Sequence, residues 1–415
     1  RSMRRLQLPH SSIPGPSQWP ILGSLPDFMS KGPEINKIHS EYYKQYGPIV
    51  RLNLLGTQEV IVYDPREYLK VFQNEGPHPS GMVGDLWMVH AATKDRPYKS
   101  YVQSTGQEWQ DKRRLVQKDV MSPTVAASYL EAINETVDKI AIRLGQLSEA
   151  EPSGRVHFKD LAKFIAFDLF CSAALGRSLD TVEPEKADPR DLKFVDDAVG
   201  SLEGVMKLFT MPHAKYLPTE TFRKMKDNFV GMDARGAELV REAAVQVQEQ
   251  EGTIGDDGPI VHRMLARGLD EEVVASELGG LLGGSVDTTQ HVVLWLLLNL
   301  ATHPDAQEKL SAEISSVLQG ANYTKSMQSK LPYLKAVIRE SHRRSHTNPL
   351  VTMRRLDTDI VLNGYEVPAG TRISFNGADM QQDPAFVEDP EIFRPERFLP
   401  DEVKKRKGDE VRAIL

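Results

Sequence analysis

The stretch "GGSVDTTQHVVLWLLLNL", residues 283–300, has the apolar texture of a buried helix but begins with residues that weaken one. Further upstream, Asp270 can cap a helix whose first turn holds Glu271 and Glu272, where the helix dipole favours anions. The helical pattern continues until "THP" at 302–304. At about 1.5 Å per residue such a helix is on the order of 48 Å long, so we expect it to be the central rod of the fold.

Glycines are the first weakness of this predicted helix, and they occupy positions 279, 280, 283 and 284. Each glycine costs a helix about 1 kcal/mol relative to alanine, so the set costs roughly 4 kcal/mol and a compensating role is expected. Their spacing of four residues pairs them on shared faces, where a flat, wide group can approach the backbone. Close packing against another helix is the alternative, and the glycines alone favour it.

Thr288 and Asp287 favour the binding of a group against this helix over simple helix packing. Thr288 lies four residues after Gly284, so its hydroxyl can bond the Gly284 carbonyl and open a local groove in the helix. Asp287 adds a titratable group to the middle of a buried element, where acids are seldom placed without purpose. An acid, a hydroxyl and a groove together predict the delivery of protons to a group bound against the helix.

Composition narrows the class of protein. The 415 residues are 40 % hydrophobic and 26 % charged, which is typical of a globular protein with a large core. The net charge of -7 argues against a nucleic-acid-binding protein. The single cysteine, Cys171, reads as a core residue, excludes a disulfide framework and indicates a reducing compartment. No apolar run reaches the roughly 18 residues that span a bilayer, so we expect no transmembrane helix.

Residues 1–25 form a basic, Pro/Gly-rich lead-in that starts with Arg1 and precedes the first acid, Asp27. Its composition fits either the remnant of a mitochondrial transit segment or a disordered basic tail. "IPGPSQWPILGSLPDF", residues 13–28, is rich in proline and glycine. We therefore expect no helix there and an extended segment that lies against the body.

Most of the remaining sequence has a helical pattern, with strand patterns near each end. "GPIVRLNLLGTQEVIVYDP", residues 47–65, predicts two strands about a turn at Gly56. From Pro65 to about Leu334 most patterns are helical, and short strand patterns follow. Breaks fall at "EGPHPSG", "EPSGR", "TMPHAKYLP" and "EGTIGDDGP". We expect one mainly α domain over residues 26–415, with a small β-region drawn from both chain ends.

Residues 284–289 resemble the distal-helix signature of the cytochrome P450 family, Ala/Gly-Gly-x-Asp/Glu-Thr-Thr/Ser. Ser285 stands where the family has a second glycine, a change that would narrow the implied oxygen groove. The resemblance implies a cytochrome P450-like fold with a haem b (heme b) cofactor and O2 as co-substrate. It also implies that Asp287 and Thr288 relay protons, while Gly284 lets the haem approach the helix.

Two later motifs follow in the order that this family has. "RESHR" contains Glu340 and Arg343 at a helical spacing of three, and alone it reads as a surface salt bridge. "FRPERF", residues 393–398, resembles the motif whose arginine, here Arg397, joins that pair in a buried network. Such additional partners are what a buried ion pair needs to offset the loss of hydration.

Two further segments resemble the parts of a cytochrome P450 that bind the haem propionates. "GQEWQDKRRL" matches the Trp-x-x-x-Arg signature, with Trp109 and Arg113 as the implied donors. "TMRRLDTDIVLNGYEVPAGT" resembles the segment whose arginine, here Arg354, binds the second propionate. Arginine suits both places because its planar guanidinium group matches a carboxylate.

The subtype resembled is the mitochondrial, ferredoxin-dependent class. "YLKAVIRESHRR" is similar to the helix on which that class docks an acidic [2Fe-2S] ferredoxin, here through Lys335 and Arg339 on one face. An ordinary solvated basic face remains the alternative. "NEGPHPSG" also resembles the mitochondrial class, which implies a mitochondrial location at the periphery of the inner membrane and a lipophilic, sterol-like substrate. The apolar segment 205–218 is a candidate membrane-contact loop, or simply a loop packed on the core.

The family also needs a cysteine thiolate on the haem iron, in a Phe-x-x-Gly-x-Arg-x-Cys-x-Gly loop beyond "FRPERF". No such loop occurs up to Leu415, so we expect the axial cysteine beyond Leu415 and no activity from these 415 residues alone. Two functions remain open. One is a fragment of a haem-thiolate monooxygenase that inserts one oxygen atom into a lipophilic substrate. The other is a naturally truncated, haem-free relative that serves as a binding or regulatory protein.

Overall fold

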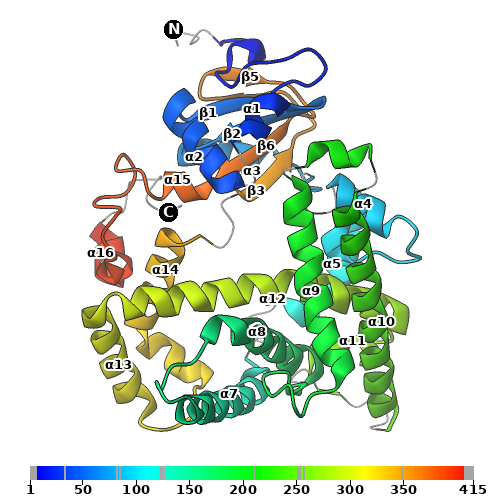
Figure 1. Ribbon diagram of the computed structural model, residues 1–415, viewed down its shortest axis with the longest axis vertical. Coiled ribbons are helices and arrows are strands. Elements are labelled where there is room, and N and C mark those ends of the chain that lie inside the picture. Colours follow the sequence, from blue (N-terminus) through cyan, green and yellow to red (C-terminus); the bar gives the residue numbers. More distant parts are fainter. Residues whose placement is uncertain are drawn as a thin grey trace.

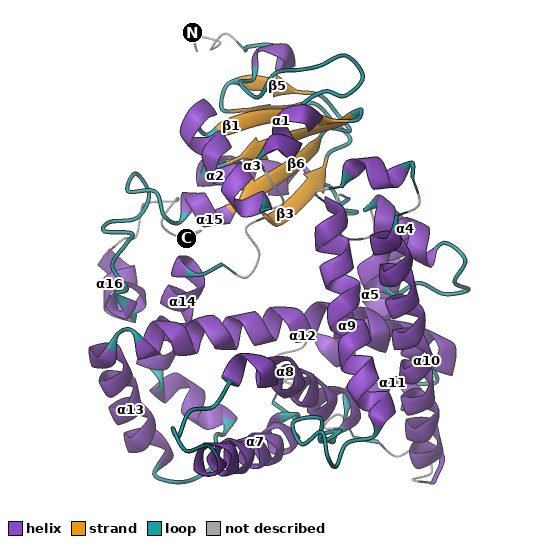
Figure 2. Ribbon diagram, viewed as in Figure 1, coloured by secondary structure: helices purple, strands orange, loops and turns teal. Residues whose placement is uncertain are grey.

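Helices make up most of the computed structural model, and the strands gather at one end of it (Figure 2). The structure describes residues 7–31, 34–80, 83, 86–121, 125, 127–209, 211–217, 219–249, 254–255, 258–346 and 350–405. Below the strands in this view, a body of long helices surrounds one that crosses it from side to side (Figure 1). The predicted mainly α fold is therefore confirmed.

The crossing helix is α12 (Glu271–Ala301), the predicted central rod. Its 31 residues correspond to about 47 Å. Asp270 occupies the predicted N-cap position, but its side chain makes no capping hydrogen bond. Three long helices pack on α12, namely α8 (Phe158–Leu175), α9 (Pro189–Phe209) and α10 (Glu220–Glu249). The prediction of a long central helix is confirmed.

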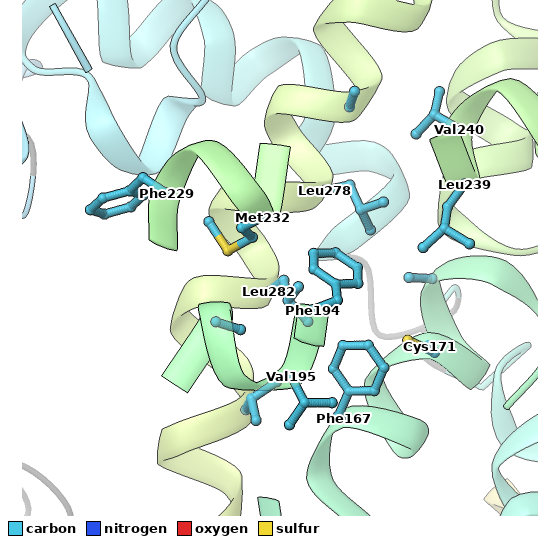
Figure 3. Packing of buried hydrophobic residues seen from close by; sticks show 14 of the residues in the cluster. Phe167, Cys171, Phe194, Val195, Phe229, Met232, Leu239, Val240, Leu278 and Leu282 are labelled. Carbon is cyan, nitrogen blue, oxygen red and sulfur yellow. The ribbon is translucent and has the colours of Figure 1, made fainter. Parts of the chain in front are cut away.

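The main hydrophobic core lies where these four helices meet (Figure 3). The rings of Phe167 on α8 and Phe194 on α9 meet edge to face, with their centroids 5.4 Å apart. Leu278 and Leu282 of α12 are buried in the same cluster. Cys171 is only 2 % exposed there, and burial raises the pKa of its thiol well above the usual value. Its surroundings are those of a core residue.

The predicted β-region is a four-stranded sheet with the order β1-β2-β6-β3. Its strands are β1 (Ile49–Leu54), β2 (Thr57–Val62), β6 (Arg372–Asn376) and β3 (Leu350–Arg355). β2 and β6 pair in parallel, whereas the other two pairs are antiparallel. Leu55 and Gly56 both have positive φ, as the two-residue turn between β1 and β2 requires. The sheet thus unites both ends of the chain, as predicted.

The lead-in packs on two groups of strands over residues 7–24. The backbone N–H of Leu8 bonds the Gly364 carbonyl, in a separate two-stranded hairpin, and the N–H of Arg51, in β1, bonds the Pro14 carbonyl at 2.9 Å. The expectation that residues 13–28 contain no helix is wrong, because α1 (Leu25–Ser30) begins inside them. Pro26 lies in the first turn of α1, where its missing N–H would have no partner in any case.

The remaining elements follow the predicted breaks closely. The other helices are α2 (Ile35–Tyr46), α3 (Pro65–Asn74), α4 (Trp87–Thr93), α5 (Gly106–Val120), α7 (Leu130–Ala150), α11 (Ile260–Ala266), α13 (Pro304–Leu318), α14 (Pro332–Arg344), α15 (Gly377–Met380) and α16 (Pro400–Lys405). Short 3₁₀ helices are η1 (His10–Ser12), η3 (Tyr101–Gln103), η4 (Pro212–Lys215), η5 (Lys325–Lys330) and η6 (Pro395–Phe398). β4 (Ile360–Leu362) and β5 (Tyr365–Val367) form a separate hairpin.

Candidate active site

The middle of α12 carries the predicted hydroxyl contact. Thr288 Oγ1 donates to the Gly284 carbonyl at 2.7 Å, and Ser285 Oγ donates to the Leu281 carbonyl at 2.8 Å. The α-helix nevertheless runs without a break from Glu271 to Ala301, so the contact forms without interrupting the helix. Because the Thr288 hydroxyl donates backwards, its lone pairs remain available as proton acceptors.

Asp287 is less buried than predicted, since its side chain keeps 22 % exposure. Gln290 Nε2 donates to its Oδ1 at 2.6 Å. His291 Nδ1 lies 2.7 Å from the Asp287 carbonyl oxygen and 3.4 Å from Oδ1. The other carboxylate oxygen makes no hydrogen bond to any described residue. Asp287 therefore retains free proton-binding capacity next to the exposed side chain of Thr288.

The four glycines of α12 divide between the two explanations that the sequence left open. A Cβ atom added at Gly280 would lie 2.2 Å from Ser100 Oγ, which only close packing explains. Added at Gly279 or Gly283, it would make ordinary contacts of 3.5 Å or more with α10. At Gly284 it would meet nothing within 4 Å. Only Gly284 leaves the helix surface open to a flat group.

Trp109 and Arg113 lie together on α5. The Arg113 guanidinium sits over the Trp109 indole, 5.1 Å from the ring centroid. Trp109 is 9 % exposed, and its Nε1–H is buried without a hydrogen-bond partner among the described residues. Arg113 makes no hydrogen bond or ion pair to them either. Buried donors rarely stay unpaired, so the Trp109 N–H suits an acceptor from outside the chain, and the half-buried Arg113 beside it offers a positive charge to the same acceptor.

Arg354 reaches the site region from β3 and is not free. Its Nε donates to the Glu75 carboxylate and its Nη1 to the Met353 carbonyl at 3.0 Å. The guanidinium also stacks on Phe72, 5.3 Å from the ring centroid. A guanidinium group has five N–H donors, so Nη2 remains available to a further carboxylate.

Glu340, Arg343 and Arg397 form one buried network. Arg343 Nε donates to Glu340 Oε2 at 2.8 Å, and Arg397 Nε donates to Oε1 at 3.1 Å. The three side chains are at most 4 % exposed. The remaining guanidinium N–H groups bond backbone carbonyls between residues 381 and 392. Burial lowers the pKa of Arg397, while the charge of Glu340 acts in the opposite direction.

An exposed face of α14, next to the one that carries the buried network, holds Lys335 and Arg339. Both are exposed, and neither forms an ion pair or a hydrogen bond within the described part of the chain. The i and i+4 spacing puts them side by side on the helix. Together they make a small, exposed cationic face on α14.

The structure places several polar residues on or beside α12 that the sequence did not indicate as candidate site residues. His291 and Gln290 could have been found, because they follow Asp287 at helical spacings of four and three. Glu277 could not, because its partners are the Tyr98 hydroxyl and the Tyr101 N–H, far away in the sequence. The ion pair of Arg96 and Asp233 also joins distant parts of the sequence, with Arg96 Nη2 2.5 Å from Asp233 Oδ2. Burial raises the pKa of Asp233 to about 6, although the charge of Arg96 lowers it.

Comparison with known proteins identifies the class. The family model of cytochrome P450 matches residues 13–411, so the chain belongs to the cytochrome P450 family. The chain is 27 % identical to the mitochondrial 1,25-dihydroxyvitamin D(3) 24-hydroxylase of Rattus norvegicus, over 95 % of this chain and 76 % of that protein. It is 27 % identical to the mitochondrial cholesterol side-chain cleavage enzyme of Oryctolagus cuniculus, over 96 % and 90 %. It is 26 % identical to sugiol synthase of Salvia miltiorrhiza, over 97 % and 80 %.

Membership of this family implies a haem cofactor and the use of O2. The residues fit a haem, since Gly284 leaves a flat opening on α12 and the Trp109 Nε1–H is an unpaired buried donor. Arg113 beside that indole suits a carboxylate. As for a bilayer, the described helices include none with both the length and the apolar character needed to cross it.

Proposed function

We propose that this protein is a haem-thiolate monooxygenase that inserts one oxygen atom from O2 into a lipophilic, sterol-like substrate. A bound haem with a thiolate ligand would supply the activation of O2. One observation carries the proposal: Asp287 and Thr288 lie beside the open Gly284 surface in the middle of the long central helix α12. Cys171 is not the thiolate, because it is buried among apolar side chains of the core.

The chain's own residues have separate tasks in this proposal. Asp287 holds a proton at its carboxylate and passes it towards the Thr288 hydroxyl, which accepts because its own hydrogen is engaged with Gly284. Trp109, Arg113 and the free Nη2 of Arg354 would hold the haem b propionates. Every guanidinium nitrogen of the Glu340 network already donates to a described partner, so this network stabilises the fold.

The electron donor that we propose is an acidic [2Fe-2S] ferredoxin docking on Lys335 and Arg339. The exposure of both side chains and their lack of described partners support this proposal. Two of the relatives described above are named as mitochondrial enzymes, which supports a mitochondrial location at the periphery of the inner membrane. The names of these relatives also support a sterol-like substrate.

The segment 205–218, a candidate for membrane contact, has both buried and exposed apolar side chains. Thr210 and Pro218 lie outside the described residues. Leu208 is fully buried in the core, so it cannot enter a bilayer. The apolar side chains that face outwards are those of Met206, Tyr216 and Leu217, of which the last two are more than 60 % exposed. We propose that these three contact lipid.

The test of the proposed function is Thr288→Ala in the haem-loaded holoenzyme with a ferredoxin donor. Electron consumption should continue while product formation falls by about 10- to 100-fold and peroxide replaces it, because the proton acceptor is gone. Thr302→Ala is the matched control, since Thr302 Oγ1 makes the same backbone contact, to Leu298 at 2.9 Å, away from Asp287. Coupling that stays intact in Thr288→Ala would overturn the proposal.

A further inference from the structure

His291 is a titratable group that the proposed function leaves without a task. It lies one turn beyond Asp287 on α12, and its side chain is 44 % exposed. Its Nδ1 is 2.7 Å from the Asp287 carbonyl oxygen, which can only accept. The neutral ring must therefore carry its hydrogen on Nδ1, and Nε2 is left with a lone pair that makes no hydrogen bond to a described residue.

The same nitrogen also faces the carboxylate. Nδ1 lies 3.4 Å from Asp287 Oδ1, slightly beyond hydrogen-bond length, so a small rotation of either side chain brings donor and acceptor together. Gln290 Nε2 also donates to that oxygen, at 2.6 Å, and so restrains the position of the carboxylate. Imidazole is the side chain best suited to take up and release a proton near neutral pH.

We propose that His291 resupplies the proton that Asp287 gives up, an inference that rests on the proposed function of Asp287 and Thr288. A proton from water binds Nε2, and the Nδ1 proton moves to Asp287 Oδ1. After the ring has rotated, water donates a proton to Nδ1, and water then removes the Nε2 proton, so that the neutral Nδ1–H ring is restored. The net result is one proton transferred from water to the carboxylate, with no change in oxidation state. His291 acts through Asp287 and is thus a positioning and proton-supplying residue.

His303 shows what such a histidine does without an acid. Its Nδ1 lies 2.7 Å from the Asn299 carbonyl, the same backbone contact four residues back. Residue 299 is an asparagine, so no carboxylate stands where Asp287 stands for His291. His303 is therefore a matched control: both histidines make the helix contact, and only His291 adjoins a proton carrier.

The decisive experiment compares His291→Asn with His303→Asn in the haem-loaded holoenzyme with a ferredoxin donor. Asparagine keeps a donor near the position of Nδ1 but cannot titrate. His291→Asn should lower product per electron consumed by about 10-fold, less than the roughly 100-fold or more of a direct proton donor, and increase the solvent deuterium isotope effect. His303→Asn should change neither. Equal behaviour of the two variants would overturn the inference.

Asp287→Asn separates this inference from the proposed function. In that background His291→Asn should cause no further loss, because a residue that acts through Asp287 has nothing left to supply. A full additional loss would show that His291 acts by another route and would sink the inference alone. If Asp287→Asn by itself leaves coupling unchanged, the proposed proton relay fails, and the inference fails with it.

A measurement without haem tests the geometry directly. Nitrogen-15 spectra of the histidine-labelled chain distinguish the two neutral tautomers of each ring. We expect the Nδ1–H tautomer for His291 and for His303, with signals assigned by His291→Asn and His303→Asn. An Nε2–H tautomer at His291 would mean that Nδ1 cannot donate to Asp287, and the inference would be overturned whatever the activity shows.

Discussion

Glu340 on α14 and Asp287 on α12 are both acids inside the helical body, and their surroundings are opposite. The Glu340 side chain has no exposed surface and lies between two guanidinium groups whose other N–H groups bond backbone carbonyls. Asp287 keeps 22 % exposure and is bonded by one amide, with a histidine 3.4 Å away. The first site is closed to protons and ligands, whereas the second is open to both.

This difference separates Glu340, whose charge stabilises the fold, from Asp287, whose carboxylate can take part in proton transfer. A buried carboxylate that is fully paired holds several segments in place, and any change in its charge is costly. A carboxylate with free capacity can gain and lose a proton without disturbing its neighbours. Glu277 lies between these extremes, because it is fully buried and, among the described residues, is bonded only by the neutral Tyr98 hydroxyl and Tyr101 N–H. The three acids therefore predict three sizes of effect.

Neutralising the closed site should have the largest effect on stability. Glu340→Gln leaves Arg343 and Arg397 buried without a counter-charge, and we expect the free energy of unfolding to fall by about 3–5 kcal/mol. Urea denaturation followed by circular dichroism measures the change. Glu388→Gln is the control, since the Glu388 side chain is 77 % exposed and its pair with Arg394 should contribute less than about 1 kcal/mol. Similar losses in both variants would contradict the contrast drawn between closed and open sites.

Glu277, the intermediate case, should make the stability of the protein depend on pH. Burial raises the pKa of Glu277 from its usual 4.5 to about 7, against the hydrogen bonds from Tyr101 and Tyr98. Between these values the folded state holds a proton that the unfolded state has released, so this group's contribution to stability falls as pH rises through the window. Glu277→Gln is always neutral and should be more stable than the parent at pH 8, by on the order of 3 kcal/mol, and equal near pH 4.5.

Stability curves of both chains at four or five pH values between 4.5 and 8 measure this difference. Asp270→Asn is the control, because it removes one carboxylate of an exposed side chain at the start of the same helix, and only a pH trend beyond that of this variant is assigned to Glu277. A constant difference between Glu277→Gln and the parent across the range would mean that Glu277 titrates normally.

The sequence predicts contacts within one helix much better than contacts between distant segments. Helical spacing brought Glu340 close to Arg343, and Thr288 close to Gly284, because contacts within one helix follow from its period. The sheet and the central rod were predictable from strand and helix periodicity for the same reason. Contacts between distant segments were not: nothing in the sequence links Ser100 to Gly280, or Glu75 to Arg354. The burial of Asp287 was overestimated, because an apolar run does not show which side of a helix stays uncovered.

The glycines of α12 allow a sharper test of open against closed surfaces. In Gly280→Ala the new methyl would lie 2.2 Å from Ser100 Oγ, so the cost of overpacking should outweigh the gain in helix propensity and lower stability by about 1–2 kcal/mol. In Gly284→Ala the methyl meets nothing, so stability should rise by up to about 1 kcal/mol.

Haem binding should change in the opposite way to stability: Gly284→Ala should lose affinity for haem, and Gly280→Ala should not. The methyl of Gly284→Ala occupies the opening proposed for the haem and should weaken haem binding, whereas Gly280→Ala should leave it nearly unchanged once folded. Thermal denaturation and transfer of haem to apomyoglobin measure the two properties. Changes of the same sign in both variants would show that the glycines have one common role, in helix packing.

The smallest effect on stability belongs to the cationic face of α14. Replacing Lys335 and Arg339 together by alanine breaks no described contact, so the free energy of unfolding should change by less than about 0.5 kcal/mol. Affinity for an acidic ferredoxin should nevertheless fall about 10-fold at low salt, and the loss should shrink as salt screens the charges. The control removes the same charge from η5, as Lys325→Ala with Lys330→Ala, both exposed on a neighbouring segment. An equal loss of affinity in the two double variants would mean that net charge alone attracts the ferredoxin and that α14 is no docking site.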